Sequence, residues 1–199
     1  MDRRDIFIKV GCQLPEEESP GSLADPMTNV LLGSGEDHSD FLEIHGPTKV
    51  VAALAAQGLK ITTPIDLSQG FDNTTQNGQE AAWKIVTEKQ PVVVYLSPFH
   101  VPWDDMQQGT SHHAKTRKLR QLYRPQLQFC AQVMKYQMKN GRYFILDGPE
   151  HSSLRYQKEI QHLVPQAYGT PCSFHSAKKG HLGLRIFYTT FHNSASRHS

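Results

Sequence analysis

Seven residues with potential chemistry stand where three hydrophobic segments of this sequence end. They are Glu43, Gly46, Asp66, Asp72, Ser97, Pro98 and His100. Carboxylates at strand ends accept hydrogen bonds from ribose hydroxyls in many nucleoside-binding sheets, and a glycine lets the backbone approach a ligand. Ligands of parallel α/β sheets bind where the carboxyl ends of strands meet loops. The placement of these residues therefore predicts a nucleoside-binding site at one edge of a sheet.

The same residues also have ordinary structural explanations. Gly46 would serve in a simple turn, and Glu43 would be an exposed residue of an edge strand. Asp66 and Asp72 would cap helices or stabilise Asx-turns. The sequence is compatible with both interpretations.

The segments that must position these residues alternate between strand-like and helix-like patterns. We expect strands over 41–45, 59–62, 91–96 and 142–146, and helices over 48–57, 76–89, 117–140 and 153–163. The continuous apolar run 91–96 is typical of a central parallel strand covered on both faces. Two further β segments, 167–174 and 184–191, are consecutive and should pair antiparallel. The pattern predicts an α/β fold with a mostly parallel sheet, a terminal antiparallel β pair and helices on both faces.

Two of the expected helices carry more specific predictions. In helix 76–89, Ala81, Trp83, Ile85 and Val86 should form the apolar face. Pro125 lies inside helix 117–140, where a proline costs about 3 kcal/mol. We therefore expect a kink or a division into two helices there.

Charge is distributed unevenly along the chain. Residues 1–43 contain ten acidic and three basic residues and have a net charge of −7. The rest of the chain has a net charge of +9, which gives the overall charge of +2. Residues 11–40 are rich in proline, glycine, serine and acids, which is linker composition. We expect an acidic, largely flexible arm over 1–40, one folded domain over 41–194 and a polar tail over 195–199.

Composition restricts the class of protein. No apolar run reaches the ~20 residues of a membrane helix, and the N-terminus lacks the apolar core of a signal peptide. We expect an intracellular protein, cytoplasmic or nuclear, with no membrane partner. Cys12, Cys130 and Cys172 are too scattered for a disulfide framework or a zinc site, and His112-His113 lacks metal-ligand spacing. No metal site is expected.

The order of the local motifs is similar to that of a known family. The motifs are Leu42-Glu43-Ile44-His45-Gly46, Pro64-Ile65-Asp66-Leu67 with Gly70-Phe71-Asp72, Ser97-Pro98-Phe99-His100, Leu146-Asp147-Gly148-Pro149 with Ser152 and Ser153, and Cys172-Ser173-Phe174-His175 with Phe191-His192-Asn193. This series, over residues 41–194, resembles the S-adenosylmethionine-dependent methyltransferase fold, specifically DNA-cytosine-methyltransferase-like domains of uncharacterised and retroelement proteins. The resemblance implies a Rossmann-like domain, S-adenosylmethionine as cofactor and a nucleic-acid base as methyl acceptor. It implies a cofactor pocket built from Glu43, Gly46, Asp66, Asp72 and Ser97.

The resemblance also implies that Pro98, His100 and Asp147 lie on the reaction side. In cytosine C5 methylation a cysteine thiolate attacks the ring and a carboxylic acid assists at the base. The family has this cysteine where this chain has His100, a proline in place of Phe99, and a glutamate in place of Asp147. An imidazole is a poor substitute for a thiolate in this addition. The domain is therefore expected to be either a methyltransferase or a pseudoenzyme with a degenerate active site.

Residues 106–146 contain no acid and provide a basic surface. The candidate nucleic-acid-binding residues are Lys115, Arg117, Lys118, Arg120 and Arg124, with Tyr123 interleaved. Such a cluster either contacts phosphates or forms a solvated helix face. An alternative function is thus a non-catalytic nucleic-acid-binding or protein-binding module of retroelement origin. A third is another nucleotide-dependent α/β enzyme.

Overall fold

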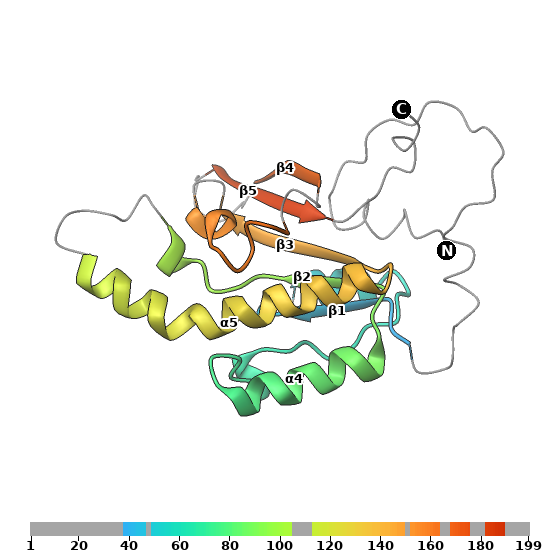
Figure 1. The fold of residues 1–199 in the computed structure, drawn as a ribbon. Helices are drawn as coiled ribbons and strands as arrows, with labels where there is room; N and C mark the ends of the chain where they lie inside the picture. The colour runs from blue at the N-terminus through green and yellow to red at the C-terminus, as the bar shows by residue number, and fades with distance from the viewer. Residues whose placement is uncertain are drawn as a thin grey trace, which may run out of the picture.

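The computed structural model describes residues 38–46, 49–104, 113–149, 152–163, 168–175 and 182–189. The arm expected over 1–40, except its last three residues, and the tail expected over 195–199 lie outside the described residues. The folded part is a sheet with helices on both faces (Figure 1). This confirms the expected mixed α/β class.

Five strands form the sheet. They are β1 (Phe41–Ile44), β2 (Val93–Leu96), β3 (Tyr143–Pro149), β4 (Tyr168–His175) and β5 (Leu182–Thr189). Their spatial order is β1-β2-β3-β5-β4. The first three are parallel, with Glu43 opposite Tyr95 and Tyr95 opposite Ile145, whereas β5 runs antiparallel to both β3 and β4. The carboxyl ends of β1, β2 and β3 therefore meet at one edge.

The strand expected over 59–62 is wrong. This segment makes two isolated parallel bridges with β1, Phe41 to Ile61 and Ile44 to Ile65. The Thr62 N–H donates to the Phe41 carbonyl at 3.0 Å, and the Ile65 N–H donates to the Glu43 carbonyl at 2.9 Å. Pro64 lies between these bonds and has no N–H, so the ladder is interrupted. The segment still runs alongside β1, on the side away from β2.

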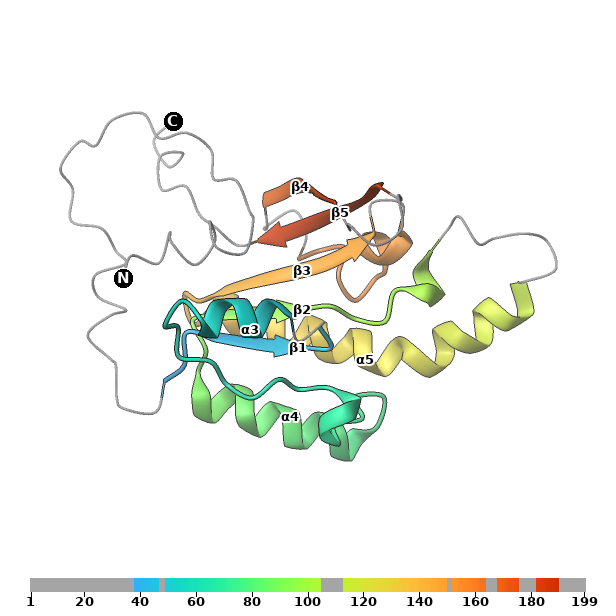
Figure 2. The same cartoon turned by 180° about the vertical axis from the view of Figure 1, so that it is seen from behind.

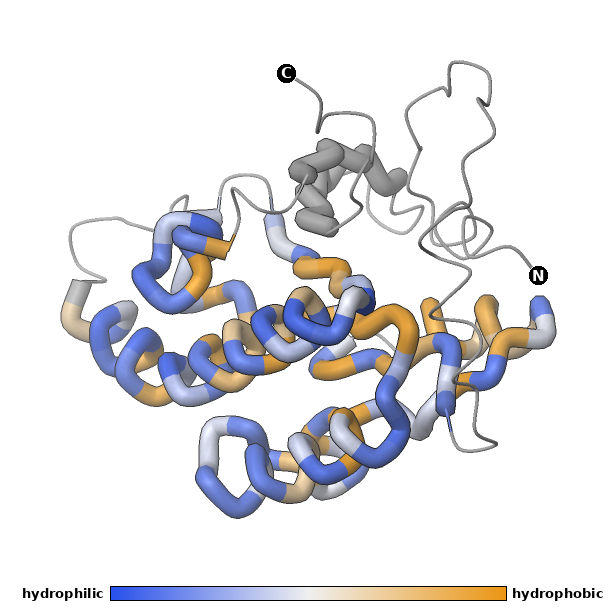
Figure 3. The backbone as a smooth tube through the Cα atoms, turned by 45° about the vertical axis from the view of Figure 1, so that its right-hand side comes forward, coloured by the Kyte–Doolittle hydropathy of each residue, from blue (hydrophilic) through white to orange (hydrophobic). Residues whose placement is uncertain are grey.

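Two hydrophobic clusters cover the two faces of the sheet. One contains Phe41, Val93 and Ile145 with Leu54 of helix α3 (Lys49–Ala55). The other contains the alternate strand residues with the inner faces of α4 (Gln76–Lys89) and α5 (His113–Lys139). Figure 2 shows α3 on the face opposite to α4 and α5, and Figure 3 shows the hydrophobic strands between helices of mixed hydropathy.

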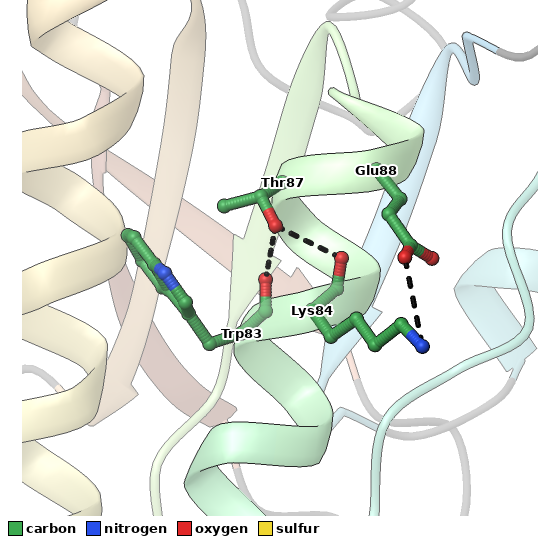
Figure 4. A network of polar contacts seen from close by, with 4 residues as sticks. All are labelled: Trp83, Lys84, Thr87 and Glu88. Atoms are coloured by element: carbon green, nitrogen blue, oxygen red, sulfur yellow. Dashed lines mark hydrogen bonds and ion pairs between the residues drawn. The ribbon is translucent and has the colours of Figure 1, made fainter.

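Helix α4 has the expected bounds, and three of the four residues expected on its apolar face, Trp83, Ile85 and Val86, pack on the core. Ala82 and Val86 are buried, whereas Ala81 is exposed, so the expectation for Ala81 is wrong. Trp83 packs edge-on against Tyr136 of α5, with ring centroids 5.1 Å apart. Thr87 lies one turn after Trp83 on the same side of the helix and bonds back to the Trp83 and Lys84 carbonyls, whereas the outer face carries the exposed Lys84–Glu88 ion pair of 3.7 Å (Figure 4).

The structure differs from the expectation for two further helices, 117–140 and 153–163. Helix α5 is continuous through Pro125, so the division into two helices is wrong, and Figures 1 and 2 show that its axis bends near the middle. A bend is expected because Pro125 removes one backbone hydrogen bond. The helix expected over 153–163 is reduced to the 3-10 turn η5 (Ser153–Tyr156), because Gln157 adopts an extended backbone conformation.

Candidate functional site

Four polar residues share one face of the three parallel strands near their carboxyl ends. They are Glu43 of β1, Tyr95 of β2, Ser97 just after β2, and Asp147 of β3. Alternate strand residues point to the same face, and the pairing registers place these four in one region above the α3 side. The sequence-predicted residues Glu43, Ser97 and Asp147 are thereby brought onto one face of the sheet.

Glu43 is fully buried, and the Val51 backbone N–H approaches its carboxylate, but neither oxygen has a partner with full hydrogen-bond geometry in the described part of the chain. A Cβ atom at Gly46 would collide with the Glu43 side chain, so Gly46 is the residue that makes room for this carboxyl. Burial raises the pKa of Glu43 to about 7, the Val51 backbone N–H opposes this, and the charge of Asp66 adds to it. The ordinary explanation of Glu43 as an exposed residue of an edge strand is therefore wrong.

His45 and Asn73 join the loop after β1 to the loop before α4. His45 has a left-handed backbone, with φ of 63°. The side-chain amide of the buried Asn73 lies 3.2 Å from His45 Nε2, measured from Nδ2, and this contact ties the two loops together. Burial lowers the pKa of His45 to about 4, against the opposing charges of Asp66 and Asp72. The Asn73 Oδ1 atom is buried without a partner in the described residues.

Asp66 and Asp72 both have local structural roles. Asp66 caps the 3-10 turn η1 (Leu67–Gln69), and its Oδ1 accepts from the Gln69 N–H at 3.0 Å and the Ser68 hydroxyl at 2.6 Å. Asp72 forms an Asx-turn with the backbone and hydroxyl of Thr74, which hold its pKa below the usual value. The N-cap interpretation of Asp66 and the Asx-turn interpretation of Asp72 are therefore confirmed. Both carboxylates also act on His45, because their negative charges raise its pKa.

Asp147 is the centre of a hydrogen-bonded network between β2 and β3. It is 1% exposed, and its Oδ2 accepts from the Tyr95 hydroxyl at 2.7 Å and the Ser97 hydroxyl at 3.2 Å. Sequence reasoning missed Tyr95, because a tyrosine inside an apolar β run is an ordinary strand residue. Only the strand register brings its hydroxyl to Asp147.

The loop after β2 is held by α5. Pro98 is buried, and the Phe99 N–H donates to Gln126 Oε1 at 2.9 Å. The Phe99 ring lies 4.5 Å from the Tyr123 ring and 6.3 Å from the His100 ring, measured between centroids. His100 precedes the 3-10 turn η2 (Val101–Trp103) and accepts the Trp103 N–H at 2.8 Å through its carbonyl.

Trp103 closes this loop onto the segment after β3. Its ring is buried, and its carbonyl accepts from the Ser152 hydroxyl at 3.2 Å and the Ser153 hydroxyl at 2.9 Å. The guanidinium of Arg120 lies 5.6 Å from the centroid of the Trp103 ring, and its Nε donates to the Pro102 carbonyl at 2.8 Å. The loop after β2 is thus fixed by internal contacts.

The candidate nucleic-acid-binding residues divide into two groups. Lys115, Arg117 and Lys118 are exposed in the first turns of α5. Arg120 contacts the β2 loop, and Arg124 forms a 2.7 Å ion pair with Glu159, whose side chain is 7% exposed. The exposed members of this candidate group therefore lie at the amino-terminal end of the helix.

Within the described ranges, no cluster of three or more histidine, cysteine or acidic side chains could hold a metal ion, and no helix is long and apolar enough to cross a membrane. Comparison of the chain with protein-family models, with curated proteins and with solved structures finds no match. The function must therefore be argued from the site itself.

Proposed function

We propose that this chain is a Rossmann-like, methyltransferase-type domain that binds S-adenosylmethionine at the carboxyl edge between β1 and β2 and acts on nucleic acid. The observation that carries the proposal is the path of the chain. From β1 it passes to the 61–65 segment on one side, and it then returns to β2 on the other. Loops that diverge in this way form a topological switch point, where open α/β sheets bind their ligands.

The residues at the switch point suit the ribose and amino groups of such a cofactor. Glu43 supplies two buried oxygens without a partner in the described residues, and Asn73 supplies a third buried oxygen. The carboxylate of Asp66 is only half-buried and lies at the end of the adjacent segment. When bound, S-adenosylmethionine would supply an electrophilic methyl group, while the chain's own role would be to accept hydrogen bonds and exclude water.

The residues Pro98, His100 and Asp147 favour cofactor binding without cysteine-dependent C5 methylation. His100 occupies the position of the family's cysteine, and Cys130 lies fully buried in the helical core, where burial raises the pKa of its thiol to about 12. Asp147 accepts two internal hydrogen bonds and is almost inaccessible to solvent. The domain is accordingly proposed to be a pseudoenzyme for this reaction.

Calorimetric titration of the full chain with S-adenosylmethionine and S-adenosylhomocysteine tests the proposal. We expect micromolar binding of either ligand, weakened about tenfold to a hundredfold by Glu43→Gln or Asp66→Ala, since each removes an acceptor for a ligand hydroxyl. Glu88→Gln on the outer face of α4 is the matched control and should bind normally. A folded protein that binds neither ligand would remove the cofactor proposal.

A second candidate function is nucleic-acid binding without a cofactor, through Lys115, Arg117 and Lys118. The supporting observation is their position at the amino-terminal end of α5, where the helix dipole disfavours positive charge. Lys118→Glu should weaken binding of a polyanion and reduce its dependence on salt by about one counterion. Lys84→Glu, an exposed lysine of α4, is the control. Binding that is insensitive to salt would contradict this function.

A further inference from the structure

The side chain of Arg142, the residue before β3, carries a donor that the described fold does not satisfy. Its guanidinium lies 5.3 Å from the centroid of the Tyr136 ring, and its Nη1 atom is buried without a hydrogen-bond partner in the described part of the chain. An arginine stays charged at any physiological pH, so such a donor is costly until an acceptor reaches it. A carboxylate suits it best, because it can accept two parallel hydrogen bonds from the planar guanidinium.

Two aromatic rings continue from Arg142 across α5 to α4. Tyr136 packs edge-on against Trp83, and all three residues are partly exposed. Figure 4 shows the Trp83 ring on the side of α4 that faces α5. Lys139 is exposed one turn after Tyr136 and adds a second base. Tryptophan, tyrosine and arginine are the residues that contribute most often to binding at protein interfaces. These four residues are called the α4–α5 surface below.

The described chain begins beside the α4–α5 surface. The Ser39 N–H donates to the carbonyl of Lys89, the last residue of α4, at 3.1 Å. The strand registers align Phe41 with Val93 and Val93 with Tyr143. Asp40 and Arg142 directly precede the outer two of these residues, so they are two strand spacings apart, or about 9.5 Å. The chain before Asp40 therefore starts within a few residues' reach of the unsatisfied guanidinium.

The composition of residues 26–37, which lie outside the described residues, complements this surface. An acidic pair, Glu36-Asp37, stands three and four residues before Asp40, and an extended chain of that length spans about 10–14 Å. An apolar run, Val30-Leu31-Leu32, precedes the acidic pair across a Gly-Ser-Gly spacer. Charge and hydropathy thus match the surface in the right order, because the base lies near Asp40 and the rings lie farther along.

We propose that segment 26–37 docks in cis on the α4–α5 surface. The acidic pair would bind the Arg142 guanidinium, and the apolar run 30–32 would cover Trp83 and Tyr136. The last part of the acidic arm would then hold the two helices together. This surface lies at the amino end of the parallel strands, whereas the proposed cofactor site lies at their carboxyl end, so the inference does not depend on the proposed function.

Native-state proteolysis of the full chain with thermolysin tests the docking. Thermolysin cleaves before apolar residues such as Leu31 and Leu32, and it reaches them only while the segment is undocked. Arg142→Glu should raise the cleavage rate within 30–32 by about threefold to tenfold, because it removes the ion pair. The arm variant Glu36→Lys with Asp37→Lys should do the same. Combining both charge reversals should bring the rate back toward that of the wild type.

Matched variants and a second readout separate docking from general effects. Glu16→Lys makes the same charge change elsewhere in the arm and should leave the cleavage rate unchanged. The chain has two tryptophans, of which Trp103 is buried, so acrylamide quenching of fluorescence reports mainly on Trp83. Leu31→Asp should increase this quenching. The arm variants change no residue of the described fold, so they keep the test valid even if Arg142→Glu destabilises the domain.

Each contrary outcome overturns a stated part of the inference. Equal cleavage rates in the wild type and in both charge-reversal variants would overturn the docking. Additive effects of the two reversals, without restoration, would overturn the pairing with Arg142. Unchanged quenching in Leu31→Asp would overturn the contact of the apolar run with Trp83. Protection that grows with protein concentration would place the arm of a second copy on this surface and overturn docking in cis.

Discussion

The two halves of the carboxyl edge differ in how their polar groups are satisfied. In the β1 half, both oxygens of the buried Glu43 and the Oδ1 of Asn73 have no partner in the described structure. In the β2–β3 half, Asp147 accepts from Tyr95 and Ser97, and the Trp103 carbonyl accepts from two serines. Both halves lie at the ends of parallel strands of one sheet.

This difference indicates two roles. A buried polar atom costs about 1–3 kcal/mol if neither the protein, a water nor a ligand satisfies it. A network that is satisfied internally needs no ligand and instead stabilises the fold. Under the proposed function, the β1 half would face the ligand and the β2–β3 half would stabilise the fold.

The largest expected effect tests the structural role of the β2–β3 half. Trp103→Ala removes a buried ring that contacts Arg120 and should lower the free energy of unfolding by about 3–5 kcal/mol. Urea denaturation followed by circular dichroism measures it. Leu67→Ala, at a highly exposed position, should stay within about 0.5 kcal/mol of the wild type. A small loss for Trp103→Ala would mean that this loop is not fixed by the fold.

Glu43 and His45 give the β1 half two opposite dependences on pH. Folding raises the pKa of Glu43 from 4.5 to about 7, so the folded state holds the proton and stability falls as pH rises through this range. Folding lowers the pKa of His45 from 6.5 to about 4, so stability rises with pH over nearly the same range. Each contribution is on the order of 3 kcal/mol, and the two nearly cancel between pH 4.5 and 6.5.

Glu43→Gln should therefore uncover the titration of His45. Its stability is expected to rise by about 3 kcal/mol from pH 4 to pH 6.5, where the wild type is nearly flat. His45→Asn should show the opposite slope, and asparagine tolerates the left-handed backbone at this position. Urea midpoints measured across this range provide the comparison. Parallel curves for the wild type and Glu43→Gln would show that Glu43 is not buried as an acid.

Elements with a strong local pattern could be predicted from the sequence. Helix α4 has the expected bounds, because Thr75 caps its first turn through the Gly78 N–H and Gln90 ends it with a left-handed backbone. The apolar run over 91–96 contains β2. The strand expected over 59–62 is wrong because Pro64, just beyond this segment, breaks the ladder with β1 that β-branched residues favour.

The candidate site could be predicted only in part. The motif residues Glu43, Ser97 and Asp147 do lie on one face, because strand ends meet at one edge. Their hydrogen-bond partners come from sequence-distant positions, as with Tyr95 and Asp147, which are 52 residues apart. A pattern of single residues therefore shows where polar groups gather, but the difference between an unpaired Glu43 and a satisfied Asp147 emerges only from packing.

A smaller effect tests the network around Asp147. Asp147→Leu leaves the Tyr95 and Ser97 hydroxyls without this acceptor and should cost about 1–3 kcal/mol of stability. Adding Tyr95→Phe removes one of the two hydroxyls that have lost this acceptor. The double variant should therefore be more stable than the sum of the two single changes predicts. Chemical denaturation of the four proteins completes the cycle. Strict additivity would show that Tyr95 and Asp147 do not interact.

The smallest expected effect separates the cap from the charge of Asp66. Asp66→Ala removes the acceptor of the Gln69 N–H and should cost about 1 kcal/mol, whereas Asp66→Asn keeps an oxygen there and should cost only a few tenths. Both variants remove a negative charge that raises the pKa of His45, so that pKa should fall further in both. Titration of His45 by NMR measures the change. If the pKa of His45 is unchanged in Asp66→Asn, the charge of Asp66 does not act on His45. The polar groups of the β1 half would then not form one cluster.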